Sequence, residues 1–143
     1  MSSLPLVRSA EVAAAHASNR PIVALESTII THGMPYPQNL EVARQVENDL
    51  RGAGVTPATI AVIDGQLHIG LEAEQLERLA RAKGVAKLSR ADLAACMAGG
   101  GTGATTVAAT MIAAVRAGSL MRAGSEIARA FRLCLLSMGC GRS

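Results

Sequence analysis

The sequence predicts an α/β fold in which helices flank a mixed, largely parallel sheet. Two short, continuous apolar runs, at residues 21–25 and 57–63, are typical of strands that are buried on both faces of a sheet. Amphipathic patterns with helical spacing occur between and after them, at residues 37–51 and 72–82. Of the 143 residues, 50% are apolar, which suffices for one domain with its own core.

The first predicted elements are a helix and a strand. Ser9 is the expected N-cap of a helix that ends before Pro21, where proline favours an extended chain. The strand at residues 21–25 is followed by Glu26, and polar, turn-forming residues then continue to Pro37. Ligands of open α/β sheets bind at this carboxyl edge. Glu26 is therefore a candidate functional carboxylate, although a Glu at a strand end also commonly pairs with a helix end or a lysine.

A hairpin is predicted in the middle of the chain. Asp64 and Gly65 form a turn signal between the apolar run at residues 57–63 and the alternating residues 66–70. This alternation predicts that His68 is an exposed strand residue. The amphipathic helix that comes next turns its apolar residues inward, namely Leu71, Leu76, Leu79 and Ala80.

A short strand from residue 85 and a helix after it are predicted next. Ser89 is the expected N-cap of this helix, with Asp92 completing a variant capping box. Lys87 would be a cation inside a buried strand end, and such a cation needs an anion.

Residues 93–115 carry no charge, but the glycine run at residues 99–103 would break a membrane-spanning helix. We expect a helix, a glycine loop and a second helix, all buried in protein. The loop either binds an anion at the helix amino terminus or only packs closely against a neighbour.

Composition argues against several classes of partner. The formal charge of +3 is modestly basic, but the basic residues are scattered and lack interleaved aromatic residues, so nucleic acid is not expected as a partner. A membrane is not expected either, because the glycine run interrupts the uncharged segment. The cysteines at positions 96, 134 and 140 have no CxxC spacing, and no secretory signal precedes them. They are interpreted as reduced thiols of a cytoplasmic protein.

Three segments carry a resemblance to a known family. The run ALESTIITHGMPYPQN at residues 24–39 resembles the signature of the pseudouridine-5'-phosphate glycosidases, also called the indigoidine synthase A family. The similarity continues in KLSRADL at residues 87–93 and in GATTVAATM at residues 103–111, where the preceding Thr102 replaces the usual Asn of the family. It implies reversible cleavage of the C-glycosidic bond of pseudouridine 5'-phosphate, which yields uracil and ribose 5-phosphate.

The resemblance also implies roles for individual residues. Glu26 matches the catalytic acid/base of the family, and Lys87 and Val107 match substrate contacts. It further implies Mn²⁺ as cofactor, a Schiff base between the opened ribose and a lysine, and a homo-oligomeric cytoplasmic enzyme.

The similarity ends near residue 118, and we predict a glycosidase-like part at residues 1–118 and an unmatched tail at residues 119–143. The family continues with a FATGGIGGVHRG segment, a metal-binding aspartate and an Ala-Lys-Ser motif with the nucleophilic lysine, and this sequence has none of them. No metal ligand is therefore assigned. The tail repeats the sequence RAGS and has apolar residues at helical spacing, so it is either an amphipathic basic helix that replaces missing core or out-of-frame translation after a truncation. We favour the second.

Three functional hypotheses follow. The first is the amino-terminal part of a glycosidase, truncated and with an incomplete sheet. It would be inactive because the nucleophilic lysine and the metal-binding aspartate of the family are missing, and Lys83 is the only lysine besides Lys87. The second is a non-catalytic protein that binds ribose phosphates or nucleotides. The third is a partner subunit whose exposed half-core pairs with another chain.

Overall fold

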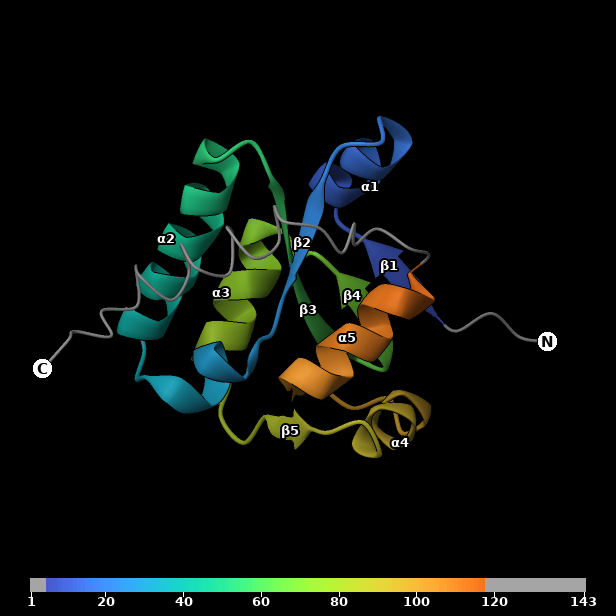
Figure 1. Ribbon diagram of the computed structural model, residues 1–143. Helices are drawn as coiled ribbons and strands as arrows, with labels where there is room; N and C mark the ends of the chain where they lie inside the picture. The colour runs from blue at the N-terminus through green and yellow to red at the C-terminus, as the bar shows by residue number, and fades with distance from the viewer. Residues whose placement is uncertain (1–4, 118–143) are drawn as a thin grey trace, which may run out of the picture.

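The computed structural model describes residues 5–117, which form three layers with helices on both faces of one sheet (Figure 1). Helices α1, α4 and α5 pack on one face, and helices α2 and α3 pack on the other. In chain order, the elements are β1 (Leu6–Arg8), α1 (Ala10–Ala17), β2 (Ile22–Leu25), the π-helical turn η1 (Ile29–Gly33), α2 (Gln38–Gly52), β3 (Thr56–Ile63), β4 (Gln66–Ile69), α3 (Ala73–Arg81), β5 (Ala86–Leu88), α4 (Asp92–Ala98), β6 (Gly103–Thr105) and α5 (Val107–Arg116).

The sheet is mixed, as the sequence predicts. Its strands follow the order β1-β4-β3-β6-β5, and β2 also pairs with β3. The pairs β1–β4, β2–β3 and β5–β6 are parallel, whereas β3 is antiparallel to both β4 and β6. All eight residues of β3 are buried, which fits its continuous apolar sequence.

One edge of β3 is shared by two short strands. Strand β2 pairs with residues 56–59 of β3, and β6 pairs with Ala61 and Val62. Because β2 is parallel and β6 is antiparallel to β3, the two strands run toward each other and their carboxyl ends meet. Strand β5 is parallel to β6, so its carboxyl end reaches the same place. This convergence positions the candidate site.

The core consists of two clusters, one on each face of the sheet. Alternate residues of β3 face the two clusters: Ile60 and Val62 contact the side of α1, α4 and α5, and Ala61 and Ile63 contact the side of α2 and α3. The inward residues predicted for α3 are confirmed, since Leu71, Leu76, Leu79 and Ala80 are all buried.

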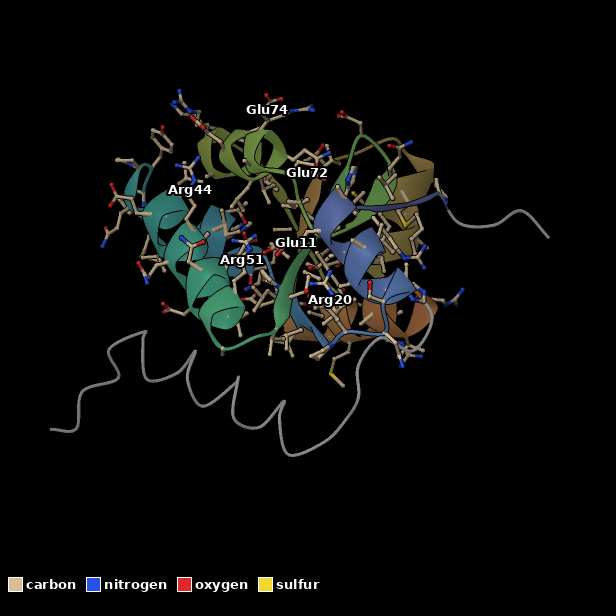
Figure 2. All side chains as sticks on the ribbon, turned by 90° about the horizontal axis from the view of Figure 1, so that it is seen from above. Glu11, Arg20, Arg44, Arg51, Glu72 and Glu74 are labelled. Atoms are coloured by element: carbon tan, nitrogen blue, oxygen red, sulfur yellow. The ribbon has the colours of Figure 1, made fainter. Side chains whose placement is uncertain are left out.

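An ionic network joins a helix from each face of the sheet (Figure 2). Arg51 of α2 donates two hydrogen bonds of 2.9 Å to the carboxylate of Glu11 in α1 and a third of 3.2 Å to Glu47. The buried Glu47 also accepts a bond of 2.7 Å from Thr59 of β3. The bonds from Arg51 lower the pKa of Glu11 below its ordinary value.

Several local predictions are confirmed. Ser9 caps α1 by accepting a hydrogen bond from the backbone N–H of Val12. Asp64 and Gly65 form the predicted hairpin turn, with φ angles of 50° and 77° that suit a two-residue loop. No helix among residues 5–117 is long and apolar enough to cross a membrane.

Two predictions about burial are wrong. Strand β2 was expected to be buried on both faces, but Val23 to Leu25 are only half-buried, and β3 is the one strand that pairs with β2 among residues 5–117. His68 was expected to be exposed, yet only 6% of it is accessible: β4 is paired with β1 and β3, and Gln75 of α3 lies 3.5 Å from the His68 ring. This burial lowers the pKa of His68.

The boundaries near the glycine run also differ from expectation. Strand β6 lies where a direct passage from glycine loop to helix was predicted. Helix α4 begins at Asp92 rather than just after Ser89, although the Asp92 carboxylate does accept a bond of 2.9 Å from the Ser89 backbone N–H. The interpretations of residues 119–143, including Cys134 and Cys140, lie outside the described residues.

Candidate functional site

Glu26 lies immediately after β2, at the point where three strand ends converge. Its side chain is half-buried. The carboxylate oxygen Oε2 accepts a bond of 3.1 Å from the backbone N–H of Thr28 and another from the Thr28 hydroxyl. The other oxygen, Oε1, has no hydrogen-bond partner among residues 5–117. The carboxylate is thus held on one side and available on the other.

Three buried hydroxyl groups join the ends of β2 and β6, and we call Ser27, Thr105 and Thr110 the hydroxyl junction. The backbone N–H of Thr105 donates to Ser27 Oγ at 2.9 Å, and the backbone N–H of Ser27 donates to the Thr105 carbonyl at 3.1 Å. The hydroxyls of Thr105 and Thr110 are bonded at 2.9 Å. All three residues are at most 5% exposed.

The junction has a clear physical cause in the sheet. Pairing of β2 with β3 ends at Thr59, and pairing of β6 begins at Ala61, so the carbonyl of Ile60 faces the gap between the two strand ends. The hydroxyls of Ser27 and Thr105 both donate to this carbonyl, at 2.6 and 2.7 Å. A buried carbonyl without such partners costs free energy comparable to a lost hydrogen bond. These hydroxyls therefore set the positions of Glu26 and of the residues after β6.

The amino terminus of α5 begins beside this junction. Thr106 is its N-cap, and its side chain accepts a bond of 3.4 Å from the backbone N–H of Ala109. Thr106 also donates its backbone N–H to the carbonyl of Leu88 in β5 at 3.1 Å. Val107 is the first residue of the helix and is 55% exposed. The positive end of the helix dipole thus lies at the convergence of the strands, where it favours an anionic ligand.

Lys87 lies on the neighbouring strand β5, in register with Ala104 of β6. It was predicted to be a cation inside a buried strand end, and this is wrong: the side chain is exposed. Among residues 5–117, β5 is an edge strand that pairs with β6. It forms no ion pair with Glu26 or with any other carboxylate of residues 5–117. The structure brings Lys87 to the same sheet edge as Glu26 but not into contact with it.

The glycine loop, residues 99–102, serves packing. Gly101 accepts a bond of 2.8 Å from the backbone N–H of Gly65, and Thr102 Oγ1 accepts one of 3.1 Å from that of Asp64. A Cβ on Gly65 would lie 2.9 Å from the Cα of Gly100. Close packing, one of the two alternatives that the sequence left open, is observed, and β6 separates the loop from the amino terminus of α5. Binding of an anion by the loop stays a prediction.

No set of three or more His, Cys, Asp or Glu side chains within residues 5–117 is arranged to hold a metal ion. The described residues thus do not fit a Mn²⁺ centre. Sequence reasoning also missed the hydroxyl junction. Its only signal is that Ser27 and Thr105 are small hydroxyl residues at the ends of short strands, which is too common to predict a contact.

Comparison with known proteins identifies relatives of this chain. The sequence profile described as "Indigoidine synthase A like protein" matches residues 11–128. A pseudouridine-5'-phosphate glycosidase of Roseobacter denitrificans is 84% identical over 118 residues, which are 82% of this chain and 38% of that protein. The Jannaschia protein of the same name is 69% identical over 116 residues, or 81% of this chain and 38% of the relative.

Two solved structures are also similar. The prealnumycin C-glycosynthase AlnA, solved in complex with ribulose 5-phosphate, is 47% identical, with a TM-score of 0.70 over 79% of this chain and 36% of that one. An indigoidine synthase A-like protein of Thermotoga maritima is 27% identical, with a TM-score of 0.71 over 82% of this chain and 38% of its own. The chain thus spans about 38% of the length of the curated relatives described above.

Proposed function

This chain belongs to the family described as indigoidine synthase A like protein, and from this premise we propose that it carries part of a pseudouridine-5'-phosphate glycosidase site. The observation that carries the proposal is the position of Glu26. Its Oε2 is held by Thr28 and its Oε1 has no partner among the described residues, at the edge where the ends of β2, β5 and β6 converge.

We assign Glu26 the role of general acid/base. The bond between ribose and uracil in pseudouridine 5'-phosphate joins two carbons, so the leaving group has no oxygen lone pair to protonate, unlike that of an ordinary glycosidase substrate. A carbon of uracil must instead receive a proton as the bond breaks. A carboxyl group that is oriented by one oxygen and open at the other suits such a transfer.

Lys87 and the first turn of α5 are proposed to bind the substrate. The ammonium of Lys87 is exposed and has no carboxylate partner among residues 5–117, so it is available to phosphate or hydroxyl oxygens. The amino terminus of α5 adds backbone dipoles that favour an anion. The exposed side chain of Val107 offers an apolar contact beside them.

Turnover needs more than these groups. The resemblance implies a Schiff base between the opened ribose and a lysine, which acts as the electron sink, and Lys83 and Lys87 are the only lysines of the sequence. Neither lies in an Ala-Lys-Ser motif. The implied Mn²⁺ would need ligands outside residues 5–117. We therefore expect this chain by itself to release no uracil; a cytoplasmic, homo-oligomeric enzyme stays a prediction from the resemblance.

The test compares this chain with a chimera in which Ala117 is followed by the remaining part of the R. denitrificans relative. Pseudouridine 5'-phosphate is supplied with and without Mn²⁺, and released uracil is measured. We expect release by the chimera and none by the chain alone. Release by the chain alone would show that its own residues suffice. An inactive but folded chimera would contradict the assignment of this segment to the site.

Binding is tested separately with ribose 5-phosphate titrated into the chimera. Lys87→Ala should weaken binding by roughly 1.5–3 kcal/mol, which is about 10- to 150-fold in affinity, as expected for a hydrogen bond to a charged group. Lys83→Ala is the matched control and should leave binding unchanged. If both variants changed the affinity for ribose 5-phosphate equally, Lys87 would not be a specific substrate contact. Saturable binding by the unfused chain without turnover would favour a ribose-phosphate binder instead.

A further inference from the structure

Asn39, the last residue of the run at residues 24–39, is a polar side chain buried in the interior. It lies in the first turn of α2 and is 3% exposed. Its nitrogen Nδ2 donates a bond of 2.7 Å to the carbonyl of Ile30 and one of 2.8 Å to the carbonyl of Ala80. Its oxygen Oδ1 accepts a bond of 2.8 Å from the backbone N–H of Leu40. The side-chain amide thus has partners for both of its N–H groups and for its oxygen.

Both carbonyls lie where regular structure leaves them without a partner. Ile30 belongs to the π-helical turn η1, in which a carbonyl bonds to the N–H five residues later, and residue 35 is a proline without an N–H. Ala80 lies in the last turn of α3, where carbonyls lack an N–H partner within the helix. One asparagine therefore joins η1, α2 and α3 at a single buried point.

The turn that Asn39 holds also carries the groups that hold Glu26. Thr28, which donates to Glu26 Oε2, is the residue directly before η1. The backbone N–H of Ile30 donates to the carbonyl of Ser27 at 3.1 Å. A change in the orientation of η1 would therefore be passed to the residues that follow Glu26.

Two different anchors hold η1 at Ile30. The side chain of Ile30 is 2% exposed and packs in the core cluster on the side of α2 and α3, which fixes how deep the turn lies. Apolar packing is non-directional, whereas a hydrogen bond weakens steeply when its angle departs from linear. The bond from Asn39 therefore fixes the direction of the Ile30 carbonyl, and with it the rotation of the turn.

We propose that Asn39 is a positioning residue for the acid/base step: it fixes the turn that begins after Thr28 and thereby orients the Glu26 carboxylate. The hydrogen bonds of Asn39 within residues 5–117 go to η1, α3 and its own helix and not to Glu26, so its action is indirect. Loss of Asn39 should slow turnover and leave substrate binding intact. This inference rests on the proposed function of Glu26.

The first test measures Asn39→Ala in the chimera. We expect kcat for pseudouridine 5'-phosphate to fall by about 10- to 100-fold, the scale for a reacting group misplaced by about 1 Å, with the affinity for ribose 5-phosphate changed less than about twofold. Asn48→Ala, an exposed change on the same helix, is the matched control and should leave both unchanged. Asn39→Ser keeps one donor group and is used if Asn39→Ala does not fold. A normal kcat in either folded variant would overturn the proposal.

A double variant tests whether Asn39 acts through Thr28. Thr28→Val removes the hydroxyl that donates to Glu26 and should lower kcat as well. If Asn39 acts by holding Thr28 in place, Thr28→Val/Asn39→Ala should lose no more than the larger of the two single losses. Single losses that multiply would show two independent effects and would overturn the proposal.

Hydrogen exchange tests the same link in the intact chain, without activity. The backbone N–H of Thr28 donates to Glu26, and that of Val62 in β3 reports on opening of the whole sheet. Asn39→Ala should speed exchange at Thr28 at least about tenfold more than at Val62. Equal increases would mean that Asn39 contributes only to overall stability, and would overturn the proposal. An inactive chimera that is folded would contradict the proposed function, whereas this measurement would still decide the role of Asn39.

Discussion

The hydroxyl junction and the glycine loop lie at the two ends of β6 and contain similarly small residues, but they do different work. At the junction, the hydroxyls of Ser27 and Thr105 donate hydrogen bonds to the carbonyl of Ile60. These bonds fix the position of Glu26 and the start of α5. In the glycine loop, the absence of side chains lets two backbones approach, as Gly100 does with Gly65. Hydroxyl groups at the strand ends thus position the candidate site, whereas the glycines of the glycine loop allow its backbone to pack closely against the hairpin turn.

The largest expected effect concerns the carboxylate that the junction positions. Glu26→Gln in the chimera keeps the size of the side chain but removes its exchangeable proton. Turnover of pseudouridine 5'-phosphate should fall by about 10²-fold or more, the usual scale for a general acid/base, with little change in ribose 5-phosphate affinity. Glu74→Gln, an exposed change on α3 shown in Figure 2, is the control. Normal turnover by Glu26→Gln would leave the carboxylate with a structural role only.

The next effect tests close packing at the glycine loop. Gly65→Ala and Gly54→Ala share a positive φ, 77° and 80°, but a Cβ at Gly65 meets backbone atoms at 2.9 Å while one at Gly54 meets nothing within 4 Å. Both should lose about 1–2 kcal/mol of unfolding free energy from backbone strain. Gly65→Ala should lose about 2 kcal/mol more from the backbone clash, as measured by urea unfolding. Equal losses would show that the loop can move away at little cost.

Two matched threonine substitutions compare the regions directly. Thr105→Val removes a buried hydroxyl that serves both Ile60 and Thr110, and should cost about 1–3 kcal/mol of unfolding free energy. Thr102→Val removes one bond, to the Asp64 backbone N–H in an exposed setting, and should cost less than about 1 kcal/mol. A larger loss for Thr102→Val would reverse the order of the two regions.

The smallest expected effect is a pH dependence of the unfolding free energy that arises from His68, on strand β4 of the hairpin. Burial lowers the pKa of His68 in the folded state, and it outweighs the nearby charge of Asp64, which acts in the opposite direction. His68 therefore binds a proton more readily in the unfolded chain than in the folded one. Its contribution to the unfolding free energy is fully present above the ordinary pKa of 6.5 and is lost as the pH falls below that value. His68→Gln should reduce this decrease between pH 7 and 5, and His16→Gln, on an exposed position, should not. If the unfolding free energy of His68→Gln decreased with pH as steeply as that of the unmodified chain, the pH dependence would have to come from another group.

Local patterns were sufficient for much of the fold. The amphipathic spacing of α3, the Asp64–Gly65 turn and the Ser9 cap each depend on a few neighbouring residues, and all three are confirmed. The position of Glu26 at the end of a strand also follows from local sequence. The family membership follows in the same way, from contiguous segments that are similar along their length.

Tertiary structure alone decided which segments meet. Ser27 and Thr105 are 78 positions apart, and only the opposed directions of β2 and β6 along β3 bring them together. Likewise, His68 is buried in a strand that β1 and β3 flank, with Gln75 of α3 beside its ring, whereas Lys87 is exposed on β5, an edge strand of the part that the structure describes. Strand pairing depends on contacts between distant segments, which carry no periodic signal in a single sequence. The segments that pack around each strand therefore determine which of its side chains are buried, and the local sequence pattern could not predict this.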